Sequence, residues 1–151
     1  MSSSPAAIRM HTKYIAPSER SMPALAMQIT ELVGSYMVWV GTTDVPAEKV
    51  ESAPSQGSLL RDWSCAMPPL NAATPPAATN LYRSSSSEIS LSMAQRLGET
   101  SCRLLARRFQ KQIFVSVDIP PSFMTLGDGS KLLVAAEKAV VQALQDIEAR
   151  G

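Results

Sequence analysis

The sequence predicts an α+β fold, with an antiparallel β-sheet of about five to six strands and two main helices on one face. Two observations support the sheet and the helices. Apolar residues alternate along 8–15 and 113–119, which is typical of strands, and they recur at helical spacing over 93–109 and 133–147. A third observation concerns size: 151 residues with 45% hydrophobic composition suit one domain, spanning 1–151, with its own core.

Three strands are expected in the first third of the chain. The segment IRMHTKYI (8–15) alternates Ile, Met, Thr and Tyr with Arg, His and Lys, as a half-buried strand does. ALAMQITEL (24–32) fits either a strand or a short helix, and a strand is favoured because a turn at Gly34-Ser35 leads into a clear strand. That strand, YMVWVGTT (36–43), is apolar on both faces, so both of its faces need cover.

The segment 45–79 differs in composition from the rest of the chain. It holds six of the eleven prolines together with many Ala and Ser residues, and is expected to be a flexible insertion. Its one apolar island, SLLRDWSCAM (58–67), is expected to form a turn or two of helix. A short strand is expected at TNLYRS (79–84).

The last third predicts two helices that flank a strand. Ser85 and Glu88 form a capping box before the first helix, whose apolar stripe runs from Met93 to Phe109. The strand IFVSVDI follows and ends at Pro120-Pro121. The second helix follows a turn at 126–130, covers 130–149, and has an apolar stripe of Leu133, Ala136, Val140, Leu144 and Ile147.

No catalytic, cofactor-binding or metal-binding site is predicted. His11 is the only histidine and lies on the polar side of its strand, where a solvated imidazole is expected. Cys65 and Cys102 have no C-x-x-C spacing, which argues against a disulfide framework or a zinc site. GDGSK (127–131) lacks the order of a phosphate-binding P-loop and is interpreted as a turn.

A stripe of basic residues runs along the first of these helices. Three roles for this stripe stay open. It could contact phosphates in a nucleic-acid-binding module, form a solvated helix face, or meet an acidic protein. The formal net charge of +1 and the absence of interleaved aromatics disfavour nucleic acid. The stripe consists of Arg96, Arg103, Arg107, Arg108 and Lys111.

The expected location is the cytoplasm, and the nucleus is also allowed. No apolar run approaches the roughly 20 residues that a membrane-spanning helix needs. The first residues, MSSSPAAIRM, have no apolar core of a secretory signal. They have a slight mitochondrial character, which Pro5 and Pro17 disfavour.

Three blocks together resemble the proteasome assembly chaperone 4 family: SYMVWVGTT (35–43), the helix-to-strand block MAQRL…LARRFQKQIFVSVDI (93–119), and LLVAAEKAVVQAL (132–144). The helix-to-strand block is the most specific of them. The chain departs from the pattern of the family in two places. It has an apparent insertion at 98–104, and its proline-rich segment at 45–79 is longer than expected.

The resemblance implies a non-enzymatic chaperone without cofactors. It implies a heterodimer with the paralogue proteasome assembly chaperone 3 that holds α-subunits, α5 in particular, during assembly of the 20S proteasome α-ring. The preferred role of the stripe is therefore contact with an acidic protein rather than with nucleic acid. The residues expected to contact an α-subunit are Arg107, Arg108 and Lys111.

In this family, pairing packs two sheets face to face. Applied to this chain, that arrangement turns Ile113, Val115 and Val117 toward its own helices. It turns Phe114 and Ser116, with Met37 and Trp39, toward the partner. Trp39 is the expected anchor, because interface hot spots favour Trp, and the alternative that Trp39 fills this domain's own core stays open.

Overall fold

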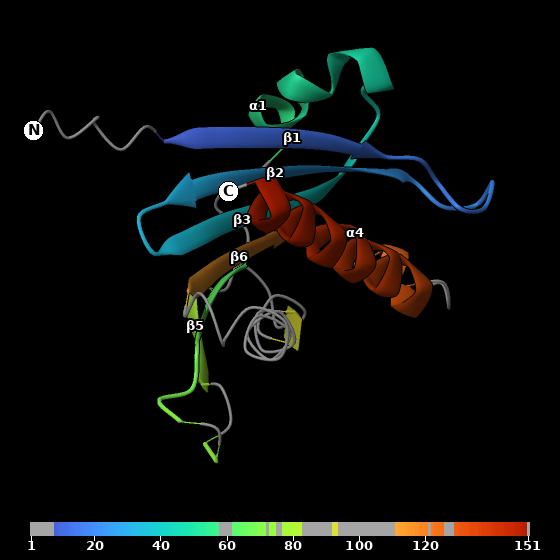
Figure 1. Ribbon diagram of the computed structural model, residues 1–151. Helices are drawn as coiled ribbons and strands as arrows, with labels where there is room; N and C mark the ends of the chain where they lie inside the picture. The colour runs from blue at the N-terminus through green and yellow to red at the C-terminus, as the bar shows by residue number, and fades with distance from the viewer. Residues whose placement is uncertain are drawn as a thin grey trace, which may run out of the picture.

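The computed structural model describes residues 8–57, 62–71, 73–74, 77–82, 92–93, 111–120, 122–125 and 129–150 (Figure 1). Within these ranges six strands form one sheet in the order β1-β2-β3-β6-β4-β5. The strands are β1 (Arg9–Ile15), β2 (Ala24–Leu32), β3 (Ser35–Thr43), β4 (Trp63–Met67), β5 (Ala77–Tyr82) and β6 (Gln112–Asp118). The helical elements are η1 (Ala47–Ser52), α1 (Ala53–Gln56), α3 (Ser122–Thr125) and α4 (Gly129–Arg150).

The sheet confirms the α+β prediction but is mixed rather than purely antiparallel. β3 and β6 run parallel, with Ser35 opposite Gln112 and Gly41 opposite Asp118. Every other neighbouring pair is antiparallel. The parallel pair arises because β6 returns to the sheet between β3 and β4, after the chain has already formed β4 and β5.

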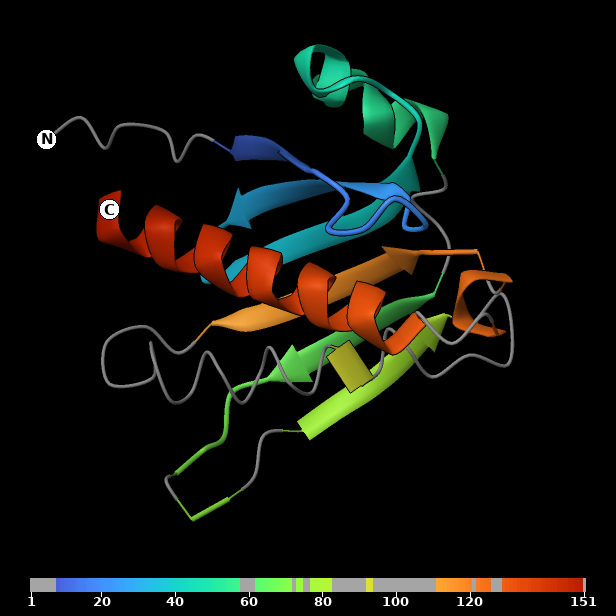
Figure 2. The ribbon, with the colours of Figure 1, turned by 90° about the vertical axis from the view of Figure 1, so that its right-hand side faces the viewer.

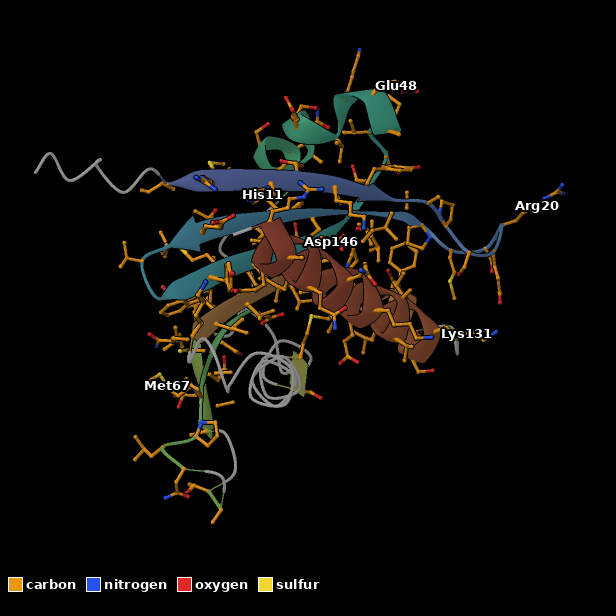
Figure 3. The ribbon with its side chains drawn as sticks, viewed as in Figure 1. His11, Arg20, Glu48, Met67, Lys131 and Asp146 are labelled. Atoms are coloured by element: carbon orange, nitrogen blue, oxygen red, sulfur yellow. The ribbon has the colours of Figure 1, made fainter. Side chains whose placement is uncertain are left out.

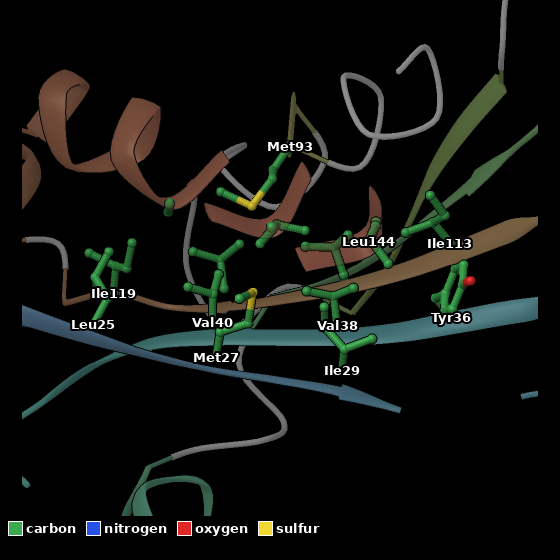
Figure 4. Packing of buried hydrophobic residues seen from close by; sticks show 14 of the residues in the cluster. Leu25, Met27, Ile29, Tyr36, Val38, Val40, Met93, Ile113, Ile119 and Leu144 are labelled. Carbon is green, nitrogen blue, oxygen red and sulfur yellow. The ribbon is translucent and has the colours of Figure 1, made fainter. Parts of the chain in front are cut away.

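The main core lies between the sheet and α4, which runs along one face of the sheet (Figures 2 and 4). Alternate residues of β2, β3 and β6 point to this face because side chains along a strand alternate between its two sides. The fully buried strand residues here include Leu25, Met27, Ile29, Tyr36, Val38, Val40, Ile113, Val115 and Val117. The helix contributes Leu132, Ala136, Val140 and Leu144, so the predicted stripe is confirmed except that Leu132 is more deeply buried than Leu133.

A second, smaller core lies on the opposite face of the sheet. It consists of Ala26, Trp39, Val45 and Ala53, with Val50 packed against them. The segment after β3 therefore folds back as η1 and α1 and covers part of the face that α4 leaves uncovered.

The structure differs from the sequence prediction in the proline-rich segment. The apolar island was expected to be helical, but its described part, Trp63–Met67, is β4, paired with both β5 and β6; positions 58–61 lie outside the described residues. Instead of an insertion outside the fold, the segment 45–79 contributes η1, α1 and β4 and begins β5. Flexibility of this segment stays a prediction.

Several predicted features fall partly or wholly outside the described residues. The capping box, positions 126–128 of the expected turn and most of the helix expected between the capping box and the strand at 113–119 lie outside them. Of that helix, Ser92 and Met93 are described as helical, and Met93 is buried in the main core. In the described ranges, no helix combines the length and the apolar character needed to cross a lipid bilayer.

Candidate protein-interaction surface

The face of the sheet opposite α4 carries an apolar surface formed by β3, β6, β4 and β5. The register places Met37 opposite Phe114, and Phe114 opposite Cys65, so these three side chains form one row across the sheet. Trp63 and Met67 alternate with buried Ser64 and Ala66, and so point to the same side as Cys65. Tyr82 pairs with Trp63 at the edge. We call the set Met37, Trp63, Met67, Tyr82 and Phe114 the open face.

The cover over this side of the sheet is uneven. η1 and α1 pack on β1, β2 and β3. In the part of the chain that the structure describes, no helix packs extensively on β4 or β5 from this side. Met67 is accordingly 47% exposed and Tyr82 56% exposed, while Met37 and Phe114 are half-buried. Met67 and Tyr82 lie at opposite ends of the β4–β5 pair, and the half-buried Trp63 lies beside Tyr82. Exposed large apolar side chains that share one face of a sheet are typical of surfaces that bind other proteins.

The four residues predicted to face a partner do share one side of the sheet. The parallel register pairs Met37 with Phe114 and Trp39 with Ser116. Their accessibility differs: Met37 and Phe114 are partly exposed, whereas Trp39 is 3% exposed and Ser116 is fully buried. Ile113, Val115 and Val117 lie on the α4 side, as predicted.

Trp39 fills the smaller core of its own chain, which is the alternative that the sequence left open. Its indole packs with Val45, Ala53 and Ala26. A Cβ at Gly41 would lie 2.6 Å from Cζ2 of Trp39, and a Cβ at Gly57 would lie 2.7 Å from the same atom. The glycine in the WVG block is therefore required by the close approach of the indole two residues before it.

Sequence reasoning missed Trp63 and Met67 because it assigned them to an insertion, and missed Tyr82 because it gave the expected strand at 79–84 no place in the sheet. A usable signal was present, since Trp63, Cys65 and Met67 alternate with smaller residues as in a strand. The strand is further tied to its neighbour on this side of the sheet by Gln112, whose Nε2 donates a hydrogen bond to Sγ of Cys65 at 2.8 Å.

Of the three basic residues predicted to contact an α-subunit, the structure describes Lys111. This lysine already forms bonds within its own chain. Its Nζ donates hydrogen bonds to Oε1 of Glu148 at 2.8 Å and to Oη of Tyr36 at 3.0 Å. The same ammonium lies 4.5 Å from the centre of the Tyr36 ring, and the Tyr36 hydroxyl donates to Glu148. Arg107 and Arg108 lie outside the described residues.

The pKa values of Tyr36 and Lys111 are both raised in this cluster. Burial raises the pKa of Tyr36 to about 12, and the hydrogen bond to Glu148 contributes to the rise. Burial alone would lower the pKa of Lys111, but its hydrogen bonds to Glu148 and Tyr36 and the charge of Glu148 together raise it. With Tyr36 and Lys111 both protonated, their bonds to Glu148 connect the start of β3 and the residue before β6 to the C-terminal turn of α4.

His11 is less exposed than the sequence suggested. It pairs with Glu31 through Nε2 and Oε1 at 2.6 Å, and its side chain is 35% exposed. Across the described ranges, no group of three or more His, Cys, Asp and Glu side chains is arranged to hold a metal ion. The arrangement of the open face suits binding of another protein.

Comparisons with known proteins identify the family and the fold of the chain. The sequence profile described as proteasome assembly chaperone 4 matches residues 24–119, from β2 to the residue after β6. No curated protein matches the chain. A chain in a crystal structure of a chaperone complex for yeast 20S proteasome assembly is similar in fold, with a TM-score of 0.54, 15% sequence identity, and coverage of 92% of this chain and 96% of that chain. The chain therefore belongs to the proteasome assembly chaperone 4 family of non-enzymatic assembly chaperones.

Proposed function

We propose that this chain forms a heterodimer with the paralogue proteasome assembly chaperone 3. We further propose that the pair holds α-subunits, α5 in particular, while the α-ring of the 20S proteasome assembles in the cytoplasm or nucleus. The observation that carries the proposal is the open face, which presents apolar side chains from four neighbouring strands. Membership of the family supports a role in proteasome assembly.

The open face suits a second sheet better than a flexible ligand. Its residues lie on regularly paired strands, and a stable interface of standard size buries about 1,600 Å² in total. Two sheets packed face to face bring their side chains together over such an area. Because η1 and α1 already occupy the β1–β3 part of this side, the partner sheet is expected to lie mainly over β6, β4 and β5.

The proposed contact with the α-subunit uses the basic stripe, with Arg107, Arg108 and Lys111 facing an acidic surface. For Lys111 such a contact would compete with its bonds to Glu148 and Tyr36. Arg107 and Arg108 are therefore the better positions at which to test α-subunit capture separately from folding.

Affinity purification of the tagged chain from cells that also express the paralogue and α5 tests this function. The wild-type chain is expected to retain the paralogue and free α-subunits, without mature proteasome. A double substitution Met67→Glu and Tyr82→Glu places two carboxylates on exposed positions of the open face, and is expected to abolish capture of the paralogue.

Val134→Glu is the matched control, because Val134 is 43% exposed on α4, away from the open face. It is expected to leave capture unchanged. Recovery of a well-behaved monomer that retains neither the paralogue nor any α-subunit would contradict the proposal.

A further inference from the structure

β1 forms one edge of the sheet, and its outer side pairs with no other strand in the described part of the chain. It runs for seven residues, with an unbroken register against β2 from Arg9–Glu31 to Ile15–Leu25. A straight, regular edge of this length offers backbone N–H and C=O groups to an added strand.

The two sides of β1 differ in chemistry. Arg9, His11 and Lys13 pair with Glu31, Ile29 and Met27, so they point to the α4 side of the sheet. The alternate residues Met10, Thr12 and Tyr14 point to the other side, and Met10 is 60% exposed. An added strand would thus meet cations on one side and apolar groups on the other.

α4 leaves the basic side of β1 accessible. A groove of about 430 Å³ lies between the strand and the C-terminal turns of the helix, and Met27 and Ile29 line it from β2. Figure 3 labels two of its lining residues, His11 on β1 and Asp146 on α4. His11 and Lys13 line it from β1, and Asp146 and Arg150 line it from α4. Side chains from a neighbouring strand can therefore reach the cations without displacing α4.

The charges around this edge favour an acidic occupant. Two carboxylates lie on this side: Glu31, opposite Arg9 on β2, accepts a hydrogen bond from His11, and Asp146, which lines the groove with Arg150, accepts one from Nε2 of Gln142 at 2.9 Å. Arg9, Lys13 and Arg150 together outweigh these two negative charges. Arg9 and Lys13 are exposed and form no ion pair within the described ranges. Exposed cations at alternate positions of an edge strand attract carboxylates at the directly opposed positions of an added strand.

A second copy of this chain is the wrong occupant for the same reason. Antiparallel pairing of two β1 edges about His11 would place Arg9 of each copy opposite Lys13 of the other. Like charges at directly opposed positions destabilise strand pairing. An occupant with the opposite charge pattern avoids this repulsion.

We propose that the outer edge of β1 binds an extended segment of another protein in which acidic and apolar residues alternate. The segment adds to the sheet as a further strand. Its acidic side chains lie beside Arg9 and Lys13, and its apolar side chains lie beside Met10 and Tyr14. This site does not depend on the proposed heterodimer, because it uses the edge of β1 rather than the open face.

Fluorescence anisotropy with a labelled octapeptide of alternating Glu and Val tests the site on the full chain. Carboxylate repulsion keeps this peptide from pairing with itself at neutral pH. Binding is expected, with at least a tenfold loss of affinity when four consecutive central amides of the peptide are N-methylated, because such a peptide cannot form the strand hydrogen bonds. The double substitution Arg9→Glu and Lys13→Glu is expected to cause a similar loss and to favour the corresponding Lys/Val peptide.

Arg20→Glu with Lys138→Glu makes the same change in net charge at exposed positions outside β1, and is expected to change affinity less than twofold. Each variant is first checked for unchanged melting by circular dichroism. Failure of the wild-type chain to bind the Glu/Val peptide would overturn the proposal, as would equal binding of the N-methylated peptide. A labelled 20-nucleotide DNA serves as a second probe. If this DNA bound more tightly than the peptide and lost affinity with Arg9→Glu and Lys13→Glu, the edge would be a nucleic-acid site and the proposal would be overturned.

Discussion

The indole of Trp39 lies directly against Gly41, two residues further along β3. A Cβ added at Gly41 would lie 2.6 Å from Cζ2 of the indole and 3.1 Å from the carbonyl oxygen of Asp118. Trp39 is 3% exposed and is held by Val45 and Ala53, so the ring has little room to move. The tryptophan and glycine of this block therefore act together in packing the chain's own smaller core.

Gly41→Ala is expected to lower the free energy of unfolding by about 1–3 kcal/mol, because overpacking forces the indole or β6 to shift. Urea denaturation of the purified chain measures this change. Gly34→Asn is a useful control. Gly34 adopts a left-handed conformation with φ of 74° and open space around it, which Asn tolerates better than other residues. The control is expected to cost less than about 1 kcal/mol.

Trp39→Ala is expected to destabilise the isolated chain by about 3–5 kcal/mol, because it empties the centre of the smaller core. The measurement is thermal or urea unfolding without any partner. A variant that melted like the wild type, yet lost affinity for the paralogue, would show instead that Trp39 belongs to the interface.

Tyr36→Phe is expected to cost about 1 kcal/mol at neutral pH, through loss of the hydrogen bonds of the hydroxyl. It also changes the pH dependence of stability. The pKa of Tyr36 is raised from 10.0 to about 12 in the folded chain, so the unfolded chain releases this proton first. The stabilisation is thus fully present below pH 10 and is lost as pH rises toward 12.

Lys111 contributes in the same direction, since its pKa is also raised above 10.5. Unfolding free energies measured between pH 9 and 11.5 are therefore expected to fall faster for the wild type than for Tyr36→Phe. The slope for one proton approaches about 1.4 kcal/mol per pH unit. Parallel curves for the two proteins would contradict the assignment of this titration to Tyr36.

Lys111→Met is expected to lower stability by about 1–3 kcal/mol, because it leaves the carboxylate of Glu148, 10% exposed, without its ion pair. Lys138→Met, at an exposed position of the same helix that Glu148 belongs to, is expected to stay within about 0.5 kcal/mol of the wild type. Chemical denaturation of both variants at pH 7 makes the comparison. An unchanged Lys111→Met variant would mean that the lysine is available for an α-subunit.

Much of the sheet could be predicted from the sequence because alternation of apolar residues is a local signal. β2, β3 and β6 lie within one residue of their expected limits. The side of the sheet to which Val115 and Phe114 point also followed from alternation. The long helix α4 followed from its 3.6-residue stripe, and its observed limits differ from the prediction by one residue at each end.

The order of the strands could not be predicted in the same way, because it depends on pairing between distant segments. β6 inserts between β3 and β4, which makes one pair parallel. Trp63–Met67 was assigned to a helical turn because a short apolar run is ambiguous and its proline-rich surroundings indicated a loop. His11 does share one side of its strand with Arg9 and Lys13. It is less exposed than expected because it pairs with Glu31 of β2 and faces the C-terminal turns of α4.

The central claim is that a paralogous chain covers the open face. Hydroxyl-radical footprinting of the chain, alone and in the purified complex with proteasome assembly chaperone 3, tests it most directly. The account predicts at least fivefold slower oxidation of Met67 and Tyr82 in the complex, with Val134 unchanged. A stable complex in which Met67 and Tyr82 are oxidised as fast as in the chain alone would contradict it.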